Sequence, residues 1–170
     1  MDDVNARAGS SRTPARLVPA GRVLGIDLGS VRIGIALSDP TRTVASPHSV
    51  LARGRDHASD HRAILEMVRE EEVTAIVVGM PLSMSGASGP AARAAVAEIA
   101  ELQTAVGPRI VVVGHDERLT TVTAERSLGN ARMKRAQRRE VVDKVAAAVM
   151  LQSWLDRPID RRSSVEATPR

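Results

Sequence analysis

Three short apolar runs in quick succession limit the folds open to this chain more than any other feature. They are VLGIDL (23–28), RIGIALS (32–38) and a shorter stretch at 43–50. Only Gly29–Val31 separate the first two runs, which is the length of a hairpin loop. Parallel pairing would need a crossover of about a dozen residues. The three runs therefore predict three antiparallel strands.

After residue 50 the pattern changes to an alternation of helices and strands. Residues 57–72 place apolar side chains among many charges, as an amphipathic helix does, and TAIVV (74–78) predicts a strand buried on both faces. The full expectation is helices at 57–72, 91–106, 120–128 and 140–155, with strands at 74–78 and 109–113. This order predicts an α/β fold with a mixed five-stranded sheet, three antiparallel strands and then two parallel ones, and helices on both faces.

The chain has the length of a single domain with its own core. Its 170 residues are 43% hydrophobic, and we expect one domain at 21–157. The segments 1–20 and 158–170 are rich in Arg, Ser, Pro and Asp, so we expect disordered tails. No apolar run approaches the ~20 residues of a membrane span, and no apolar signal region precedes the domain. We therefore expect a cytoplasmic protein that does not bind membranes.

Composition removes several classes of function. The chain has no cysteine, which excludes thiol catalysis, cysteine-bound zinc and disulfides. Its formal net charge is +4, and most of the basic residues are Arg, whose planar guanidinium suits phosphate. With one Trp and no Tyr or Phe, base stacking cannot be the main mode of recognition. A nucleic-acid partner would be bound through its backbone and shape, although ordinary surface charge explains the same total.

Three acidic residues lie in or beside elements that should otherwise be apolar. Asp27 interrupts VLGIDLG, where Asp is depleted because its charge must be solvated or paired. Asp116 and Glu117 follow the predicted strand RIVVV, where the chain leaves the sheet. A strand alternates faces, so only one of the two faces the site, and Asp116 is the one that favours a structural role. Asp143 shares a helical face with Ala147 and Met150, so packing through that face directs its carboxylate towards the strands. Each acid alone is compatible with a structural role, whereas the three together favour one shared site.

Converging carboxylates repel one another, and protonation or a bound cation must relieve the repulsion. Oxygen ligands select hard ions, so we predict Mg²⁺ or Mn²⁺. Two such ions ~4 Å apart can activate a water and neutralise the leaving oxygen in phosphodiester hydrolysis. We predict that Asp27 bridges two ions, that Glu117 holds one and that Asp143 holds the other. Glu140, one helical turn before Asp143, is either an additional ligand or a first-turn acid favoured by the helix dipole.

Basic residues crowd the segment just before Asp143, where they either bind phosphate or form an ordinary solvated face. They are Arg132, Lys134, Arg135, Arg138 and Arg139. His115 could act as a base, but a histidine at the end of a strand is more often packed or hydrogen-bonded. The glycine-rich loop GMPLSMSGASGP (79–90) is either a mobile substrate loop or a long connection.

Four segments carry a resemblance to a known family. They are GIDLGSVRIGIALSD (25–39), VVGMPLSMSGASGP (77–90), HDERLTT (115–121) and DKVAAAVMLQ (143–152). In this order and spacing they resemble the YqgF family, also called RuvX, whose members are named Holliday junction resolvases or pre-16S rRNA nucleases. The resemblance extends over residues 22–156 and so covers everything except the two tails.

The resemblance implies an RNase H-like fold, related to RuvC-type resolvases, and a metal-dependent nuclease. It assigns the acidic site to the Asp of G-x-D-x-G, the Glu of D-E-R-L-T-T and the Asp of D-x-x-A-A. In this chain these residues are Asp27, Glu117 and Asp143. The family assignment therefore agrees with the three acids singled out above by their positions.

The resemblance also implies a set of residues around the acids. Arg118, Thr120 and Thr121 would surround the site, with Arg118 beside the scissile phosphate. Gly25 and Gly29 would keep the first strand free of bulk near the metal.

Other functions remain open. GIDLGS (25–30) resembles the first phosphate loop of actin-like ATPases and sugar kinases, but those proteins enclose a nucleotide between two such domains, and this chain has no GxxxxGK loop. An RNase H-like factor that binds nucleic acid without cutting it is a second alternative, against which the acidic trio argues.

The substrate of a nuclease also stays open between the 5′ end of pre-16S rRNA and a Holliday junction. Both present backbone and shape without a need for base stacking. A resolvase that cuts two strands symmetrically should be a homodimer, whereas processing an RNA end needs only one site.

Overall fold

The computed structural model describes residues 20–80, 89–116 and 135–157. A five-stranded sheet forms its centre, in the order β3-β2-β1-β4-β5. The strands are β1 (Arg22–Leu28), β2 (Arg32–Ser38), β3 (Ala45–Ala52), β4 (Val73–Met80) and β5 (Val111–Asp116). β1 pairs antiparallel with β2, and β2 with β3, while the β1–β4 and β4–β5 pairs are parallel. The predicted mixed sheet is confirmed.

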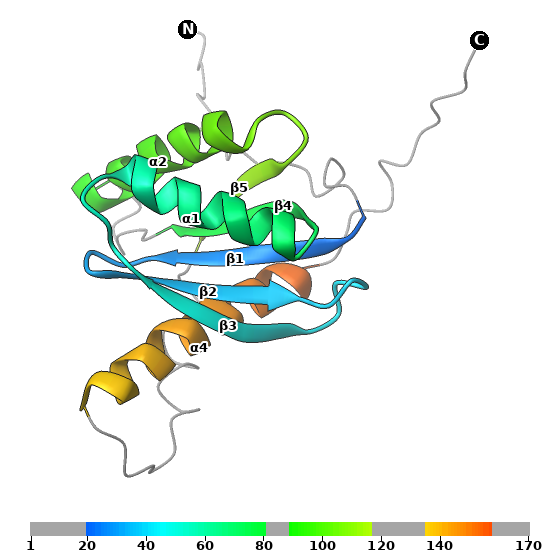
Figure 1. Ribbon diagram of the computed structural model, residues 1–170. Coiled ribbons are helices and arrows are strands. Elements are labelled where there is room, and N and C mark those ends of the chain that lie inside the picture. Colours follow the sequence, from blue (N-terminus) through cyan, green and yellow to red (C-terminus); the bar gives the residue numbers. More distant parts are fainter. Residues whose placement is uncertain (1–19, 81–88, 117–134, 158–170) are drawn as a thin grey trace, which may run out of the picture.

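Helices cover both faces of this sheet (Figure 1). They are α1 (His57–Glu70), α2 (Pro90–Val106) and α4 (Arg135–Leu155). α1 and α2 pack on one face, and α4 crosses the other. The predicted RNase H-like arrangement, with helices on both faces of a mixed sheet, is therefore confirmed.

Strand alternation divides the core into two apolar clusters. In β4, Ile76 and Val78 belong to the cluster under α1 and α2, whereas Ala75 and Val77 belong to the cluster under α4. All four side chains are fully buried. The continuous apolar run of β4 thus fills both faces, as predicted for a strand covered on two sides.

The ends of α1 and α2 follow ordinary helix chemistry. α1 begins after Asp56, whose carboxylate accepts a hydrogen bond from the backbone N–H of Ser59 at 2.8 Å. α1 ends at Glu70, before the predicted residue 72, because Glu72 has a φ of 53° and turns the chain into β4. α2 ends at Val106 and is followed by the capping residue Gly107, with a φ of 76°, which confirms the predicted Gly-Pro stop.

The start of α4 corrects one prediction. The helix begins at Arg135 rather than at residue 140, because the intervening residues, RAQRRE, include no proline or glycine and are mostly good helix formers. Arg135, Arg138 and Arg139 therefore lie within α4 and not in a stretch before it. Glu140 is likewise beyond the first turn, so the interpretation of Glu140 as a first-turn acid was wrong.

β5 and β3 both begin two residues later than predicted. β5 covers Val111–Asp116 instead of 109–113, because its parallel ladder with β4 continues to the pairs Gly79–His115 and Met80–Asp116. β3 begins at Ala45 rather than at residue 43, because the backbone N–H groups of Thr43 and Val44 donate to the Asp39 carboxylate instead of to a strand.

Some predictions fall outside the described residues. They concern the tails at 1–20 (apart from residue 20) and 158–170, the loop after Met80 and the helix expected at 120–128. Within the described residues, none of the helices combines the length and the apolar character that crossing a membrane requires.

Candidate active site

The sheet register directs Asp27 towards α4. Asp27 pairs with Gly34 in the antiparallel ladder of β1 and β2, and directly opposed residues point to the same face. Val23, four residues earlier in the same alternation, belongs to the apolar cluster under α4. The Asp27 carboxylate therefore lies on the α4 face, near the carboxyl-terminal end of the central strand.

Glycines let α4 lie unusually close to this part of the sheet. A Cβ atom on Gly34 would overlap the backbone oxygen of Asp143. A Cβ on Gly25 would lie 2.8 Å from the Cβ of Leu151. The space beside Gly25 is therefore taken by the helix and is not left open for a metal, which corrects the role implied by the resemblance. The same close packing places Asp143 opposite Asp27.

The two acids influence each other electrostatically. Burial, and secondly the negative charge of Asp143, raise the pKa of Asp27 above its ordinary value. The Asp143 side chain is 31% exposed, so the pair lies at the border between the core and solvent. This arrangement favours a bound cation, because a cation would remove both the repulsion and the penalty for burying a charge.

Arg32 is a residue of this site that the sequence did not reveal. Its Nε donates to Oδ2 of Asp143 at 2.7 Å, an ion pair that joins β2 to α4. Arg32 precedes Gly34 by two residues and therefore lies on the same face as Asp27. Strand periodicity gives only the face of β2 on which Arg32 lies, while its contact with Asp143 depends on the register of β2 against β1 and on the docking of α4.

The remaining acids of the predicted site are described only in part. Glu117 lies outside the described residues, but β5 ends at the preceding residue, Asp116. β5 runs parallel to β4 and β4 to β1, so the chain leaves β5 at the same edge of the sheet where Asp27 lies. Glu140 is in α4, one turn before Asp143, and its side chain is not described. The structure therefore brings together Asp27 and Asp143 of the predicted ligands.

The predicted substrate-binding residues also lie mostly beyond what is described. Those outside the described residues are Arg118, Thr120, Thr121, Arg132 and Lys134. Arg135, Arg138 and Arg139 belong to the first turns of α4, and only their backbone is described. All three arginines precede Asp143 in the helix.

A metal fits the donors that are present. Two carboxylates are the oxygen ligands that Mg²⁺ and Mn²⁺ prefer, and the raised pKa of Asp27 indicates a site that is short of positive charge. Within residues 20–80, 89–116 and 135–157, no group of three acidic or histidine side chains is arranged to hold an ion. Asp27 and Asp143 would therefore supply two carboxylate ligands to a bound cation.

His115 is packed in the core. It is 1% exposed, and its Nε2 lies 3.4 Å from the hydroxyl of Ser153 on α4. This agrees with the structural interpretation of a histidine at a strand end rather than with a role as a solvent-accessible base.

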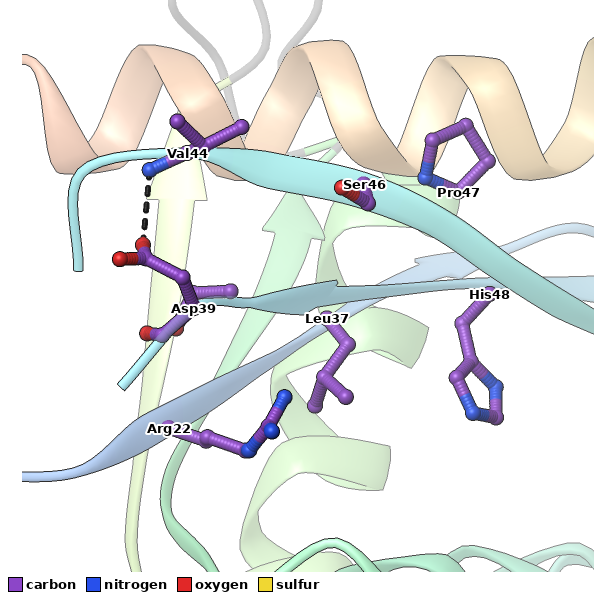
Figure 2. A pocket seen from close by; sticks show the side chains of 8 residues that line it. Arg22, Leu37, Asp39, Val44, Ser46, Pro47 and His48 are labelled. Atoms are coloured by element: carbon purple, nitrogen blue, oxygen red, sulfur yellow. Dashed lines mark hydrogen bonds between the residues drawn. The ribbon is translucent and has the colours of Figure 1, made fainter. Parts of the chain in front are cut away.

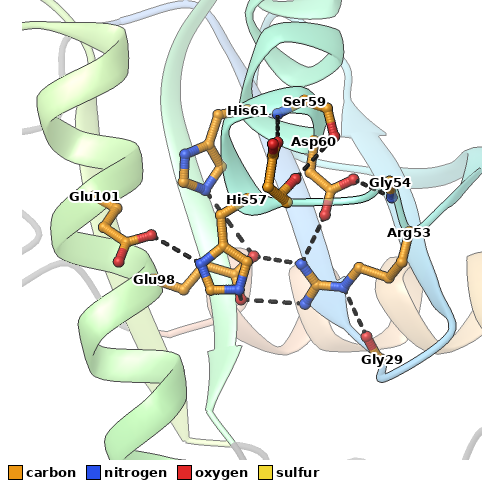
Figure 3. Close-up of polar contacts among 10 residues, drawn as sticks. Gly29, Arg53, Gly54, His57, Ser59, Asp60, His61, Glu98 and Glu101 are labelled. Carbon is orange, nitrogen blue, oxygen red and sulfur yellow. Dashed lines mark hydrogen bonds and ion pairs between the residues drawn. The ribbon is translucent and has the colours of Figure 1, made fainter.

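A buried network supports the turn that follows Asp27 (Figure 3). The Nε of Arg53 donates to the carbonyl of Gly29 at 3.0 Å, and its terminal nitrogens reach Asp60 at 3.0 Å and Glu98 at 2.6 Å and 3.1 Å. Asp60 and Glu98 lie on α1 and α2, so the network ties both helices to the β1–β2 turn. The sequence did not reveal it, because acids on amphipathic helices usually face solvent.

An open cavity of about 280 Å³ lies away from the acids (Figure 2). It is lined by Arg22 at the start of β1, by Leu37 and Ser38 at the end of β2 and by the first half of β3. Asp27 lies at the other end of β1. The cavity therefore does not belong to the candidate site.

Comparison with known proteins shows the family. A sequence model of the RuvX family, described as Holliday junction resolvase, matches residues 21–157. A relative from Roseiflexus sp. (strain RS-1) is 45% identical over 136 residues, which are 80% of this chain and 94% of the relative. A relative from Mycobacteroides abscessus is 42% identical over 136 residues, 80% of this chain and 81% of the relative. Both carry the name "Putative pre-16S rRNA nuclease".

Among solved structures, the chain is similar to RuvC of Thermus thermophilus in complex with a Holliday junction substrate. The TM-score is 0.47 and the identity 14%, over 80% of this chain and 96% of that chain. The family match, which covers nearly all of the described residues, and the relatives at 40% identity or more carry the assignment. The chain belongs to the RuvX family.

Proposed function

We propose that this protein is a divalent-metal-dependent nuclease that hydrolyses phosphodiester bonds of structured nucleic acid. The observation that carries the proposal is the approach of Asp27 to Asp143 across the β1–α4 contact, where burial and the charge of Asp143 raise the pKa of Asp27. A bound cation would compensate this burial and repulsion, whereas the ion pair with Arg32 compensates only the charge of Asp143. The names of the RuvX family and of its relatives support nuclease chemistry.

In this proposal Asp27 and Asp143 hold the cation together with Glu117, and Glu140 is an additional ligand. A bound Mg²⁺ or Mn²⁺ supplies the activation of water and the neutralisation of the leaving oxygen. Arg118 and the basic residues at the start of α4 would neutralise the phosphate, with Thr120 and Thr121 beside them. The buried network around Arg53 would keep the turn after Asp27 rigid, so that the first ligand is preorganised.

Two substrates are candidates, and a different observation favours each of them. The names of the relatives favour pre-16S rRNA, whose 5′ end is the substrate that we propose, and the description of the family favours a Holliday junction. Both substrates offer closely spaced phosphates to a protein with a net charge of +4 and few aromatic residues. Junction resolution would in addition require a homodimer, because two strands must be cut symmetrically.

The test compares wild type and Asp27→Asn on a labelled four-way DNA junction and on an RNA with a precursor 5′ extension. Each reaction is run with Mg²⁺, with Mn²⁺ and with EDTA. Glu66→Gln, an exposed acid on α1 on the opposite face of the sheet, is the matched control. We expect cleavage that needs the metal, is lost in Asp27→Asn and is unchanged in Glu66→Gln.

The outcomes separate the proposals. Paired symmetric nicks in the junction would establish a resolvase and predict a dimer in sedimentation, whereas cleavage of the RNA alone would place the protein in rRNA maturation. Tight binding of either probe without cleavage under any metal would contradict the nuclease and support a non-catalytic binding factor.

A further inference from the structure

We propose that Arg32 binds a backbone phosphate of the substrate and that, in the free protein, it occupies Asp143 in place of the divalent cation. The proposal rests on the nuclease function proposed above and adds a residue to that site. In this view Asp143 exchanges Arg32 for the cation when the substrate binds, and Arg32 turns to the phosphate.

The position of Arg32 places a guanidinium group at the edge of the acidic pair. Arg32 begins β2, and Gly34, two residues later, is paired with Asp27. α4 lies directly on Gly34, which brings Asp143 within 2.7 Å of the Arg32 Nε. A substrate phosphate that approaches the two carboxylates would therefore meet Arg32 at the same place.

The charges of the site explain why Arg32 is held where it is. Asp143 has a cationic partner, whereas Asp27 forms no ion pair with any of the described side chains. The pair of acids thus has two negative charges and one compensating positive charge, if only the described residues are counted. By this count the site is one positive charge short, which a divalent cation would supply.

The geometry of the ion pair leaves Arg32 able to bind phosphate. Only Nε contacts Asp143, and the two terminal nitrogens make no hydrogen bond to the residues that the structure describes. The side chain is 31% exposed, so these donors are accessible from solvent. A guanidinium offers parallel N–H donors that match two oxygens of one phosphate.

Cation binding and phosphate binding are coupled by this arrangement. A cation on Asp143 competes with Arg32 for the same carboxylate and repels its positive charge. Arg32 is then free to bind the anion that arrives with the substrate. A purely structural role, as a tie between β2 and α4, makes the opposite prediction, because loss of the tie would disorder Asp143 and weaken the cation site.

The first experiment measures Mn²⁺ affinity by calorimetry in the absence of nucleic acid. Arg32→Gln removes the competing charge, so we expect Mn²⁺ to bind about 3- to 10-fold more tightly. Arg62→Gln, which removes an exposed arginine of α1 on the other face, should leave the affinity unchanged. Weaker Mn²⁺ binding by a folded Arg32→Gln would overturn the proposal.

The second experiment measures nucleic-acid affinity by fluorescence anisotropy, with Ca²⁺ in place of Mg²⁺ so that cleavage does not interfere. The probes are a four-way DNA junction and an RNA duplex with a 5′ extension. We expect Arg32→Gln to bind about tenfold more weakly, with the slope of log K against log salt smaller by about one. Arg32→Lys should keep the slope but lose part of the affinity, because an ammonium cannot bind two oxygens as a planar fork.

The results remain decisive if one variant is unstable. Circular dichroism and urea unfolding identify a variant that does not fold. If Arg32→Gln does not fold, Arg32→Lys takes its place in the binding experiment. Unchanged affinity of Arg32→Lys for both probes would then overturn the proposal. Unchanged binding and salt slope in a folded Arg32→Gln would do the same. If Asp27→Asn abolishes cleavage while Arg32→Gln behaves as wild type, only the role of Arg32 is wrong. If Asp27→Asn still cuts, the nuclease site itself is wrong.

Discussion

Asp27 is the residue at which the proposed metal site would cost the fold stability. It is a half-buried acid at the end of the central strand, and Asp143 adds a second negative charge beside it. Both effects favour the neutral form of Asp27, and both would be compensated by a bound cation. In the metal-free protein the ionised form of Asp27 is therefore a destabilising feature of the fold.

This leads to a stability prediction for Asp27→Asn in EDTA. The pKa of Asp27 is raised above 3.8 in the folded state, so its ionisation removes stability as the pH rises through the folded pKa. Asparagine stays neutral, and we expect Asp27→Asn to unfold at a higher urea concentration than wild type at pH 7. The difference should shrink as the pH falls towards 4. A lower midpoint for the variant at pH 7 would contradict the account.

Asp39 behaves in the opposite way and gives a second prediction. Hydrogen bonds from the Thr41 hydroxyl and from backbone N–H groups, among them that of Val44, lower the pKa of Asp39 to about 2. A lowered pKa contributes stability that is present above the ordinary value of 3.8 and is lost as the pH falls through about 2. Asp39→Asn should therefore lose stability at pH 5 to 7 and differ less from wild type near pH 2. Urea unfolding at several pH values measures this, with Glu66→Gln as a control that should follow wild type throughout.

At the scale of elements, the contact between α4 and the first two strands determines the site. Glycines at 25 and 34 remove the side chains that would hold the helix away. The apolar residues that follow Asp143 in α4, including Ala147, Met150 and Leu151, are buried against the sheet. The carboxylate is therefore positioned by the packing of a whole helix rather than by a loop, which makes its placement rigid.

Gly34→Ala tests this contact. A methyl group at residue 34 would overlap the Asp143 backbone oxygen, so α4 must move away from β2. We expect a loss of about 1–3 kcal/mol in the free energy of unfolding and a large loss of nuclease activity, because Asp143 moves with the helix. Gly89→Ala is the control, since nothing lies within 4 Å of a Cβ there, and it should retain activity. Full activity in Gly34→Ala would show that this contact does not position the site.

The Arg53 network gives a prediction about the opposite face. Arg53 is 17% exposed, and its partners Asp60 and Glu98 are 5% and 8% exposed. Arg53→Met would leave two buried carboxylates without their cation, so we expect a loss of about 3 kcal/mol at pH 7. Arg55→Met removes an exposed arginine of the same loop and should have little effect. Urea unfolding of both variants measures the difference, and equal losses would contradict the role assigned to Arg53.

At the scale of the whole molecule, the order of the strands places the residues of the candidate site at one edge of the sheet. β1 lies between an antiparallel half and a parallel half. Its carboxyl-terminal end is therefore beside the β1–β2 turn on one side and beside the ends of β4 and β5 on the other. Residues that are far apart in the sequence meet there, and α4 packs on the face of the sheet opposite α1 and α2 (Figure 1).

Much of this architecture could be predicted from the sequence, because short-range patterns determine it. The loops between the first three strands are too short for anything but antiparallel pairing. The β-branched run of β4 and the Gly-Pro stop after α2 are equally local signals. Asp143 could be placed on the buried face of its helix from the spacing to Ala147 and Met150 alone, and both of these are buried as expected.

The parts that could not be predicted depend on contacts between distant segments. The ion pair of Arg32 with Asp143 requires the register of β2 against β1 and the docking of α4, and neither follows from local periodicity. The same holds for Arg53, whose partners lie on two different helices. The start of α4 was placed too late because its first residues are polar, and helix propensity rather than amphipathicity continues the helix there.

The most direct test of the central claim is the rate at which Asp143→Asn cuts a labelled substrate under single-turnover conditions. We expect a rate at least about a thousandfold below wild type, because the variant loses a ligand of the cation. Its affinity for nucleic acid in Ca²⁺ should be retained, because the surface that binds the backbone is unchanged. A near-normal rate in Asp143→Asn would contradict the claim that Asp27 and Asp143 form one metal-dependent site.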